Sequence, residues 1–284
     1  MQDSDNIALA QDDPDALVRQ GLSAYREGSI AKSRYFFRRV LQNATSESLA
    51  YRTARKLTEF EEQFLEITYE GRAFYLLMPK GRLPGLVVKR PSFQEWETLN
   101  FLRQYSNDHK NILDVGCNIG NHSLFFYHFL NSRNIFGFDP APNAGFFYCQ
   151  NVPQAKFFNL ALGAQDQSVD LAGDILNGRW SQSKIMPGSP IREDLKKITT
   201  RSLDSFEFRD VTLLKIDVES WEIPVLEGGM QTIKRDRPLI VIEFLPQNRE
   251  KYAAFFAQHL PEYKIVFSVE APTTGRQDLV FRAD

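Results

Sequence analysis

From residue 112 onward, short apolar runs alternate with longer segments whose apolar residues recur on one helical face. Short apolar runs bounded by turn residues are typical of buried strands, and the longer amphipathic segments are typical of helices. Strands are predicted at residues 112–115, 134–138, 155–160, 168–172, 198–202, 211–216, 239–244, 263–269 and 278–282. Helical segments are predicted at residues 120–129, 144–151, 203–206, 220–233 and 247–259, and a loop is predicted over residues 173–193.

Apolar strands that are separated by helices predict a parallel sheet with both faces covered. The last two strands are joined without a helix, so one of them is expected to run antiparallel. Pro224 is compatible with the helix at residues 220–233 only in its first turn. This part of the chain is therefore predicted to be an α/β domain.

The segment before residue 111 has a different pattern. Residues 1–13 are polar and acidic, which predicts a disordered tail. Residues 14–66 show helical spacing that Gly28 interrupts, and they resemble one tetratricopeptide repeat with a further helix at residues 46–66. A single repeat cannot bury both of its faces, so two readings are open. The helices bind a protein partner, or they form a plain helical hairpin that shields the next domain, which a single copy favours.

The second domain is expected to run over residues 67–284, with residues 67–110 as its N-terminal extension. Short strands are predicted in this extension at residues 67–70, 73–78 and 86–89, followed by a helix at residues 93–105.

Composition narrows the class of protein. Lys and Arg number 34 against 36 for Asp and Glu, so no excess of positive charge favours nucleic acid as a partner. No apolar run approaches the length of a membrane span, and the acidic N-terminal segment lacks the pattern of a signal peptide. The two cysteines, Cys117 and Cys149, cannot build a disulfide framework. We therefore expect a cytoplasmic protein that binds no nucleic acid.

The stretch at residues 111–122 reads N-I-L-D-V-G-C-N-I-G-N-H and places an acid and two glycines between a strand and a helix. In an open parallel sheet, ligands bind at the carboxyl ends of the strands. The dinucleotide fingerprint G-x-G-x-x-G is incomplete, because only Gly116 and Gly120 are present, and no G-K-[ST] closes a phosphate loop. The preceding carboxylate, Asp114, suits a ligand that has an amino group and no phosphate.

Four ordered motifs resemble the FkbM family of S-adenosylmethionine-dependent methyltransferases. The first, D-V-G-C-N-I-G at residues 114–120, resembles the family's D-V-G-A-N-I-G. The others are G-F-D-P at residues 137–140, N-L-A-L-G at 159–163, and K-I-D-V-E-S-W-E at 215–222, which V-L-E-G follows at 225–228. A P-x-I-x-x-E ending follows at residues 238–243, and the resemblance covers about residues 94–283.

The resemblance implies a Rossmann-like α/β fold, preceded here by the small helical region. It implies a seven-stranded, mostly parallel sheet with helices on both faces and the last strand antiparallel. It also implies S-adenosylmethionine as the cofactor. Ser220 stands where the family usually has Gly, Cys117 where Ala is commoner, and Asp139 where Glu is common. A serine at position 220 would be strained if the backbone there has a positive φ.

The resemblance also implies the cofactor site. The residues expected against the methionine part and the ribose are Gly116, Asn118, Gly120 and Asn121. Asp139 would accept hydrogen bonds from the ribose hydroxyls, although it also suits a helix N-cap before Pro140. Asp114 would hold the amino group of the cofactor or brace the loop. Leu160 and Ala161 would flank the adenine or only fill the core.

Carboxylates at neighbouring strand ends form a second candidate site, with Asp217, Glu219, Glu222 and Glu243 as its members. Buried carboxylates are unfavourable without partners, so three uses are open. They deprotonate an acceptor hydroxyl, they pair with Lys215 or an arginine, or they bind a divalent cation. No histidine accompanies them at metal spacing, so no metal ligand is assigned.

Asp217 and Glu219 are the first candidates for the base. His122 is the second, and its alternative is a plain polar residue at a helix start. Glu222 and Glu243, with Trp180 from the predicted loop, are expected on the acceptor side of the site.

The resemblance therefore implies a methyltransferase that uses S-adenosylmethionine and acts on a hydroxyl oxygen of a sugar, glycolipid or secondary metabolite. Its partners would be a small-molecule or glycan acceptor and, through the N-terminal helices, a protein. One alternative is a catalytically inactive adaptor that binds the cofactor. The intact acids Asp114, Asp139 and Asp217 argue against it. A second alternative is a nicotinamide-dependent oxidoreductase, which the missing third glycine disfavours.

Overall fold

The computed structural model of the chain describes residues 13–26, 36–37, 39–40, 45, 48, 62–79, 93–105, 109–132, 134–141, 144–174, 179–185, 195–244, 246–271 and 275–284. The chain divides into two compact units, Met1–Leu83 and Pro84–Asp284. The predicted tail at residues 1–13, apart from Asp13, and the predicted strand at residues 86–89 lie outside the described residues.

The first unit contains helix α1 (Pro14–Arg26) and a strand hairpin. The Asp13 carboxylate accepts hydrogen bonds from the backbone N–H groups of Asp15 and Ala16, so Asp13 caps α1 with Pro14 at its first position. Gly21 lets the ring of Phe37 approach the helix, because an added Cβ would lie 2.6 Å from that ring. The rest of the proposed tetratricopeptide-like unit lies largely outside the described residues, so that resemblance stays a prediction.

The strand hairpin consists of β1 (Glu62–Tyr69) and β2 (Arg72–Pro79), which pair antiparallel. Glu70 and Gly71 both have positive φ, as a two-residue hairpin turn requires. The helix predicted at residues 46–66 is wrong from Glu62 onward. There, cross-strand pairing of residues 62–66 with residues 75–79 uses the backbone hydrogen bonds that a helix would need.

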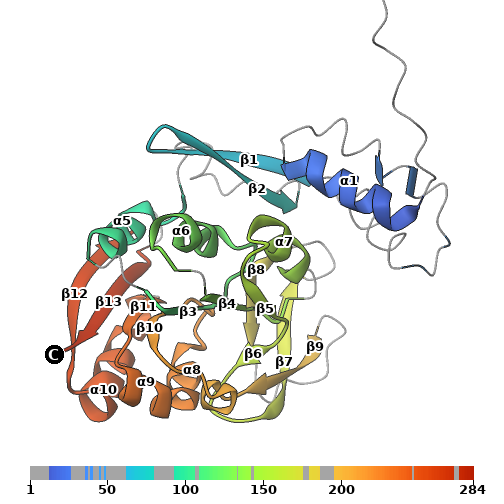
Figure 1. Ribbon diagram of the computed structural model, residues 1–284. Helices are drawn as coiled ribbons and strands as arrows, with labels where there is room; N and C mark the ends of the chain where they lie inside the picture. Colours follow the sequence, from blue (N-terminus) through green and yellow to red (C-terminus); the bar gives the residue numbers. More distant parts are fainter. Residues whose placement is uncertain are drawn as a thin grey trace, which may run out of the picture. The chain divides into compact units, whose positions relative to one another are not determined.

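The second unit is built on a seven-stranded sheet with the order β12-β13-β11-β10-β3-β4-β5 (Figure 1). The strands are β3 (Asn111–Val115), β4 (Asn134–Phe138), β5 (Lys156–Phe158), β10 (Val211–Ile216), β11 (Leu239–Phe244), β12 (Tyr263–Glu270) and β13 (Gln277–Ala283). Strands β5, β4, β3, β10 and β11 pair in parallel, whereas β13 is antiparallel to both of its neighbours. The predicted sheet, including its antiparallel last strand, is confirmed. Strand β3 is the switch point, because the chain builds outward from it in both directions.

Helices cover both faces of this sheet, with α5 to α7 on one face and α8 to α10 on the other (Figure 1). They are α5 (Trp96–Tyr105), α6 (Asn121–Phe129), α7 (Ala144–Asn151), α8 (Glu222–Gly228), α9 (Met230–Asp236) and α10 (Arg249–His259). Short 3-10 turns, η1 (Leu203–Phe206) and η2 (Pro246–Asn248), precede β10 and α10. Among the described residues, no helix has the length and apolar character needed to span a bilayer.

The helix predicted at residues 220–233 is divided into α8 and α9, which meet at Gly229. Asp204 causes a new helix start there, because its carboxylate accepts hydrogen bonds from the N–H groups of Gln231 and Thr232 at 2.9 and 2.8 Å. Pro224 lies in the first turn of α8, as expected.

A second sheet lies beside the first, with the order β6-β9-β7-β8. Its strands are β6 (Ala161–Leu162), β7 (Gln167–Asp174), β8 (Arg179–Ile185) and β9 (Leu195–Arg201). The loop predicted over residues 173–193 is wrong at β7's last residues and throughout β8, which pairs antiparallel with β7. An edge strand tolerates polar side chains on both faces, so β8 has no apolar run to reveal it.

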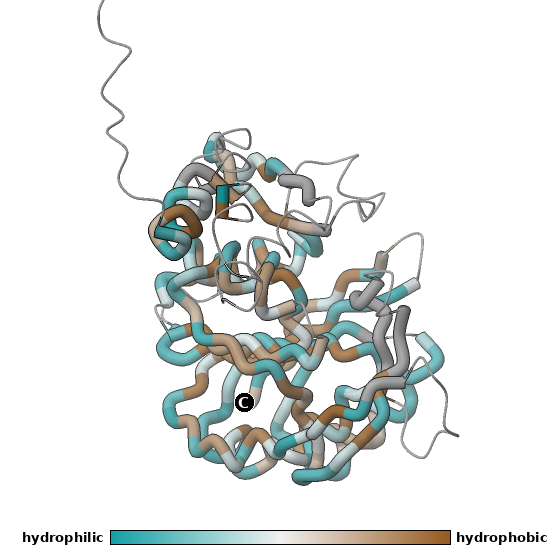
Figure 2. Tube along the Cα trace, turned by 90° about the vertical axis from the view of Figure 1, so that its right-hand side faces the viewer, coloured by the Kyte–Doolittle hydropathy of each residue, from teal (hydrophilic) through white to brown (hydrophobic). Residues whose placement is uncertain are grey.

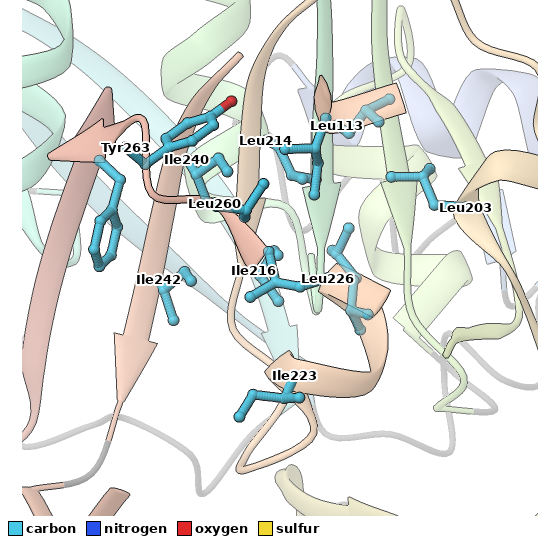
Figure 3. Packing of buried hydrophobic residues seen from close by; sticks show 14 of the residues in the cluster. Leu113, Leu203, Leu214, Ile216, Ile223, Leu226, Ile240, Ile242, Leu260 and Tyr263 are labelled. Carbon is cyan, nitrogen blue, oxygen red and sulfur yellow. The ribbon is translucent and has the colours of Figure 1, made fainter. Parts of the chain in front are cut away.

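The main core lies between the central strands and helices α8 to α10 (Figure 3). Leu214, Ile216 and Ile240 on the sheet are fully buried and belong to one cluster with Leu226 and Leu260. Figure 2 shows hydrophilic and hydrophobic residues mixed along the chain. This core fixes the carboxyl ends of β3, β4 and β10, where the predicted site residues lie.

Candidate functional site

The loop between β3 and α6 has a backbone that turns sharply three times. Gly116, Asn118 and Gly120 have φ of 78°, 48° and 88°, all in the left-handed region. Gly116 has no room for a side chain, because an added Cβ would lie 1.8 Å from the carbonyl oxygen of Asp217. No side chain of the described residues caps the start of α6, so its first backbone N–H groups are available to a ligand. The loop itself is tightly bonded: Gly116 N and Cys117 N donate to the Phe138 carbonyl oxygen, and Gly120 N donates to that of Cys117. We call residues 116–120 the glycine cradle.

Asp139 ties this loop to the end of β4. Its carboxylate accepts hydrogen bonds from Asn118 N at 2.9 Å and from Ala141 N at 2.8 Å. The second bond forms a local turn around Pro140 and is not the helix N-cap that was the alternative for Asp139, because α7 begins only at Ala144. Each carboxylate oxygen keeps a further acceptor position for a ligand hydroxyl. Burial raises the pKa of Asp139 to about 6, although the two backbone N–H groups oppose that shift.

Asp114 is fully buried below the loop, where its carboxylate joins a polar network. Ser123 Oγ donates to Asp114 Oδ2 at 2.6 Å, and Tyr148 donates to Ser123 Oγ at 2.9 Å. The ammonium of Lys215 lies 3.4 Å from Asp114 Oδ1. The sequence left two roles open for Asp114, holding the cofactor's amino group or bracing the loop. These partners within the chain are the ones that bracing the loop requires.

Lys215 also connects the loop to the first catalytic candidate. Its Nζ lies 3.3 Å from the Gly116 carbonyl oxygen and 3.3 Å from Asp217 Oδ2. Burial lowers the pKa of Lys215, but the charges of Asp217 and Asp114 outweigh burial and raise it. Burial raises the pKa of Asp217, but Lys215 and neighbouring donors outweigh burial and lower it. Asp217 is therefore ionised at neutral pH and a weak proton acceptor.

Glu219, the other first candidate for the base, is paired with Arg276 from the segment before β13. Both terminal nitrogens of Arg276 donate to Glu219, at 3.0 to 3.2 Å, and Nη1 also donates to Glu243 at 2.6 Å. Burial and the charges of Asp217 and Glu95 raise the pKa of Glu243 to about 9 despite Arg276. Burial and the neighbouring acids thus favour the protonated form of Glu243, whereas the Arg276 guanidinium at 2.6 Å favours its carboxylate. The sequence anticipated an arginine partner but could not say which one.

Glu222 has a different surrounding from the one expected. It is 2% exposed, and its carboxylate accepts hydrogen bonds from Val218 N, Ser220 N and the hydroxyl of Tyr252. The expectation that Glu222 lies on the acceptor side is thus corrected: it braces the turn that carries Asp217 and Glu219, because the turn's N–H groups have no helix or sheet partner. Trp180 lies in β8, and its side chain is outside the described part of the chain.

The turn after β10 is strained. Glu219 and Ser220 have φ of 53° and 80°, so the serine at the family's usual glycine position does occupy a left-handed backbone. Its side chain gains only a 3.4 Å contact from the amide of Asn248. Strain of this kind persists where surrounding bonds enforce it, and here the Glu222 carboxylate does so.

Ser220→Gly is expected to raise the free energy of unfolding by about 1 kcal/mol, since glycine adopts this φ without steric strain. Urea unfolding at constant pH measures the change. Ser202→Gly is the matched control, because Ser202 has an ordinary φ of −72° and makes no capping bond with its side chain. The control should lose about 0.5–1 kcal/mol, and equal losses in both variants would contradict the assignment of strain to Ser220.

His122 lies in the first turn of α6 and pairs with Glu95, its Nε2 3.1 Å from Glu95 Oε2. Asn121, at the start of the same helix, accepts a hydrogen bond from Gln94 N at 3.3 Å. Of the two residues expected near the adenine, Leu160 is half-buried against the core, and Ala161 is buried at the start of β6. The structure thus brings the first motif and the acids of the last motif together at neighbouring strand ends.

Glu95, Glu243 and Asp278 bring carboxylate oxygens within 4.8 Å of one another. Thr98 donates to Asp278 at 2.6 Å. Burial and the charge of Glu95 raise the pKa of Asp278 to about 7. Burial and neighbouring acids thus favour the protonated forms of Glu243 and Asp278, and the divalent cation considered from the sequence stays a prediction.

The open parallel sheet has the glycine cradle after its switch-point strand β3, Asp139 after β4, and Asp217 and Glu219 after β10. This arrangement defines a Rossmann-like ligand-binding protein. The FkbM methyltransferase domain matches residues 114–265, and the chain belongs to this family of methyltransferases. The family predicted from the sequence is thereby confirmed. No curated protein matches the chain.

Several solved structures are similar to it at low sequence identity. The FkbM methyltransferase of Methylobacillus flagellatus KT is 16% identical with a TM-score of 0.47, over 62% of this chain and 44% of that one. The chain thus spans less than half of that relative's length. An rRNA methylase of Streptococcus thermophilus is 9% identical with a TM-score of 0.43, over 66% of this chain and 94% of that one. A Streptococcus mutans protein described as a methyltransferase in complex with SAH is 10% identical with a TM-score of 0.42, over 66% and 97%.

Proposed function

We propose that the chain transfers a methyl group from S-adenosylmethionine to a hydroxyl oxygen of a sugar, glycolipid or secondary metabolite. The observation that carries the proposal is the bond between Asn118 N and the Asp139 carboxylate. This bond joins the glycine cradle to the acid of the next strand, so the uncapped start of α6 and a ribose acceptor belong to one braced unit. The family to which the chain belongs supports methyl transfer.

The residues present fit this cofactor. Gly116 and Gly120 let the cradle lie close against the end of β10 and against Val152, because their added Cβ atoms would lie 1.8 Å from Asp217 O and 2.9 Å from Val152 Cγ2. The cradle and Asn118 would hold the methionine part and the ribose, and Asp139 the two ribose hydroxyls. Leu160 and Ala161 would flank the adenine. Asp114, fully buried, would act on the methionine end by bracing the loop.

The bound cofactor would supply a methyl group that its positive sulfur already activates. The chain's own residues would then align the acceptor with that methyl group and exclude water. A hydroxyl acceptor must also lose its proton. Lys215 and Arg276 hold Asp217 and Glu219 as ion pairs, which suits orientation of the acceptor better than proton removal.

Titration calorimetry with S-adenosylmethionine and S-adenosylhomocysteine tests the proposal, with NADH as the competing ligand. Binding of both adenosyl ligands and of no nicotinamide is expected. Incubation with methyl-labelled S-adenosylmethionine and a cell extract, followed by mass spectrometry, should then identify the labelled acceptor. A protein that binds neither adenosyl ligand would overturn the proposal. Tight binding without any labelled product would favour the inactive adaptor instead.

A further inference from the structure

The carboxylate of Glu95 lies against the imidazole ring of His122. Glu95 Oε2 is 3.1 Å from His122 Nε2, and the two side chains are 20% and 10% exposed. Glu95 comes from the turn before α5, outside the four motifs, whereas His122 follows the first motif directly. The contact therefore joins the turn before α5 to the start of α6, the helix that follows the glycine cradle.

The turn that carries Glu95 is held in place from three sides. Phe93 is buried and packs edge-on against the ring of Phe125 at 5.2 Å. Gln94 N donates to Asn121 Oδ1, and Leu99 N donates to the Glu95 carbonyl oxygen. Glu95 itself has a φ of 56°, which an L-residue adopts only at an energetic cost. A strained residue so firmly held is a reason to look for a function.

The charges around His122 determine its protonation. Those that act on it from neighbouring elements are Glu95, Asp114, Asp217, Asp278 and Lys215. Burial lowers the pKa of His122, but the charge of Glu95 and the hydrogen bond to it outweigh burial and raise the pKa above the ordinary value. In neutral His122, the bond from Nε2–H to Glu95 leaves Nδ1 as the proton acceptor. The ring is thus oriented and made more basic by one partner.

We infer that Glu95 is a positioning residue that orients His122 as the general base of the methyl transfer. The inference rests on the proposed function. The acceptor oxygen forms a bond to the methyl carbon, and the bond between carbon and sulfur breaks with its electron pair going to sulfur. The hydroxyl proton passes to His122 Nδ1, which becomes an imidazolium paired with Glu95. Asp217 and Glu219 are less suited to this step because Lys215 and Arg276 already pair with them.

The first test needs no acceptor. The chain has four histidines, and the imidazole signal of His122 is assigned by comparison with His122→Asn. An NMR titration of Glu95→Gln should show the pKa of His122 lowered by about one unit or more, since an adjacent carboxylate is lost. Glu97→Gln is the matched control, because it removes the same charge from the first turn of α5. An unchanged His122 titration in Glu95→Gln would overturn the inference.

The second test measures, across pH, the rate of methyl-label transfer into the cell extract that yields a labelled product. The wild-type rate should rise with pH as His122 loses its proton. In Glu95→Gln this rise should shift to lower pH. The rate at the high-pH plateau should fall by up to about tenfold, because the base is weaker. Glu95→Asp, which retains the charge, should keep the rise closer to the wild-type pH and also serves if Glu95→Gln fails to fold. A merely structural Glu95 would lower the rate at every pH without moving the rise, and that result would overturn the inference.

The two proposals fail in different ways. If calorimetry detects no S-adenosylmethionine binding by the wild type, the proposed function is wrong, whatever the titration of His122. If the wild type binds and transfers the label and His122→Asn transfers it equally fast, the proposed function stands and the assignment of His122 and Glu95 is wrong.

Discussion

Asp139→Ala is expected to weaken S-adenosylmethionine binding at least about 100-fold. Two hydrogen bonds from ribose hydroxyls to a carboxylate contribute roughly 1.5–3 kcal/mol each, and each 1.4 kcal/mol is about tenfold in affinity. The alanine also removes the bonds from Asn118 N and Ala141 N, so the loop loses its tie to the end of β4. Calorimetry measures the affinity, and circular dichroism confirms that the variant is folded.

Asp204→Ala separates the loss of ligand contacts from the loss of backbone bracing. Asp204 also accepts two backbone N–H groups through its carboxylate, those of Gln231 and Thr232, but it does so at the start of α9. Asp204→Ala should therefore lose a similar amount of stability, about 1–2 kcal/mol as for a helix cap, and keep the wild-type affinity. If Asp139→Ala binds the cofactor as tightly as Asp204→Ala does, Asp139 is not a ribose ligand.

Gly116→Ala is expected to cost more than about 4 kcal/mol of folding free energy, a loss that few single substitutions reach. The added Cβ would lie 1.8 Å from the Asp217 carbonyl oxygen, so the loop after β3 and the end of β10 cannot both keep their places. The φ of 78° adds about 1–2 kcal/mol of strain for an L-residue. Urea unfolding measures the loss, and calorimetry on any folded fraction should detect no cofactor binding.

Gly71→Ala is the control for backbone strain alone. Gly71 has nearly the same φ, 73°, but an added Cβ there would meet no atom within 4 Å. It should therefore lose only about 1–2 kcal/mol. If the two variants lost equal stability, the close contact with Asp217 would not be what requires glycine at position 116.

The sequence predicts the central strands well because their surroundings are uniform. Strands β4, β10 and β11 have the predicted bounds, since a strand buried on both faces is an unbroken apolar run that turn residues end. Strand β8 could not be predicted in this way, because its pairing with β7 depends on backbone hydrogen bonds rather than on side-chain pattern. Glu62–Glu66 was misassigned to a helix for the same reason.

The candidate site was predictable as far as its motifs reach. The motifs name the glycines, Asp139 and the acids after β10, because these positions lie at strand ends that the apolar runs reveal. Arg276 and Glu95 belong to none of the motifs. The order of the strands brings Arg276 to Glu219 and Glu243, and the packing of α5 on α6 brings Glu95 to His122. Glu222 shows the opposite limit: its place in a motif did not reveal whether its carboxylate faces a ligand or the chain's own backbone.

The place of β13 between β11 and β12 has a consequence for synthesis of the protein. As the chain leaves the ribosome, β12 emerges before β13 but has no neighbour to join until β13 has inserted beside β11. Arg276, which immediately precedes β13, reaches Glu219 and Glu243 in the same event. A nascent chain therefore closes its sheet and forms the ion pair between Arg276 and Glu219 together, only after nearly all of this domain has been translated.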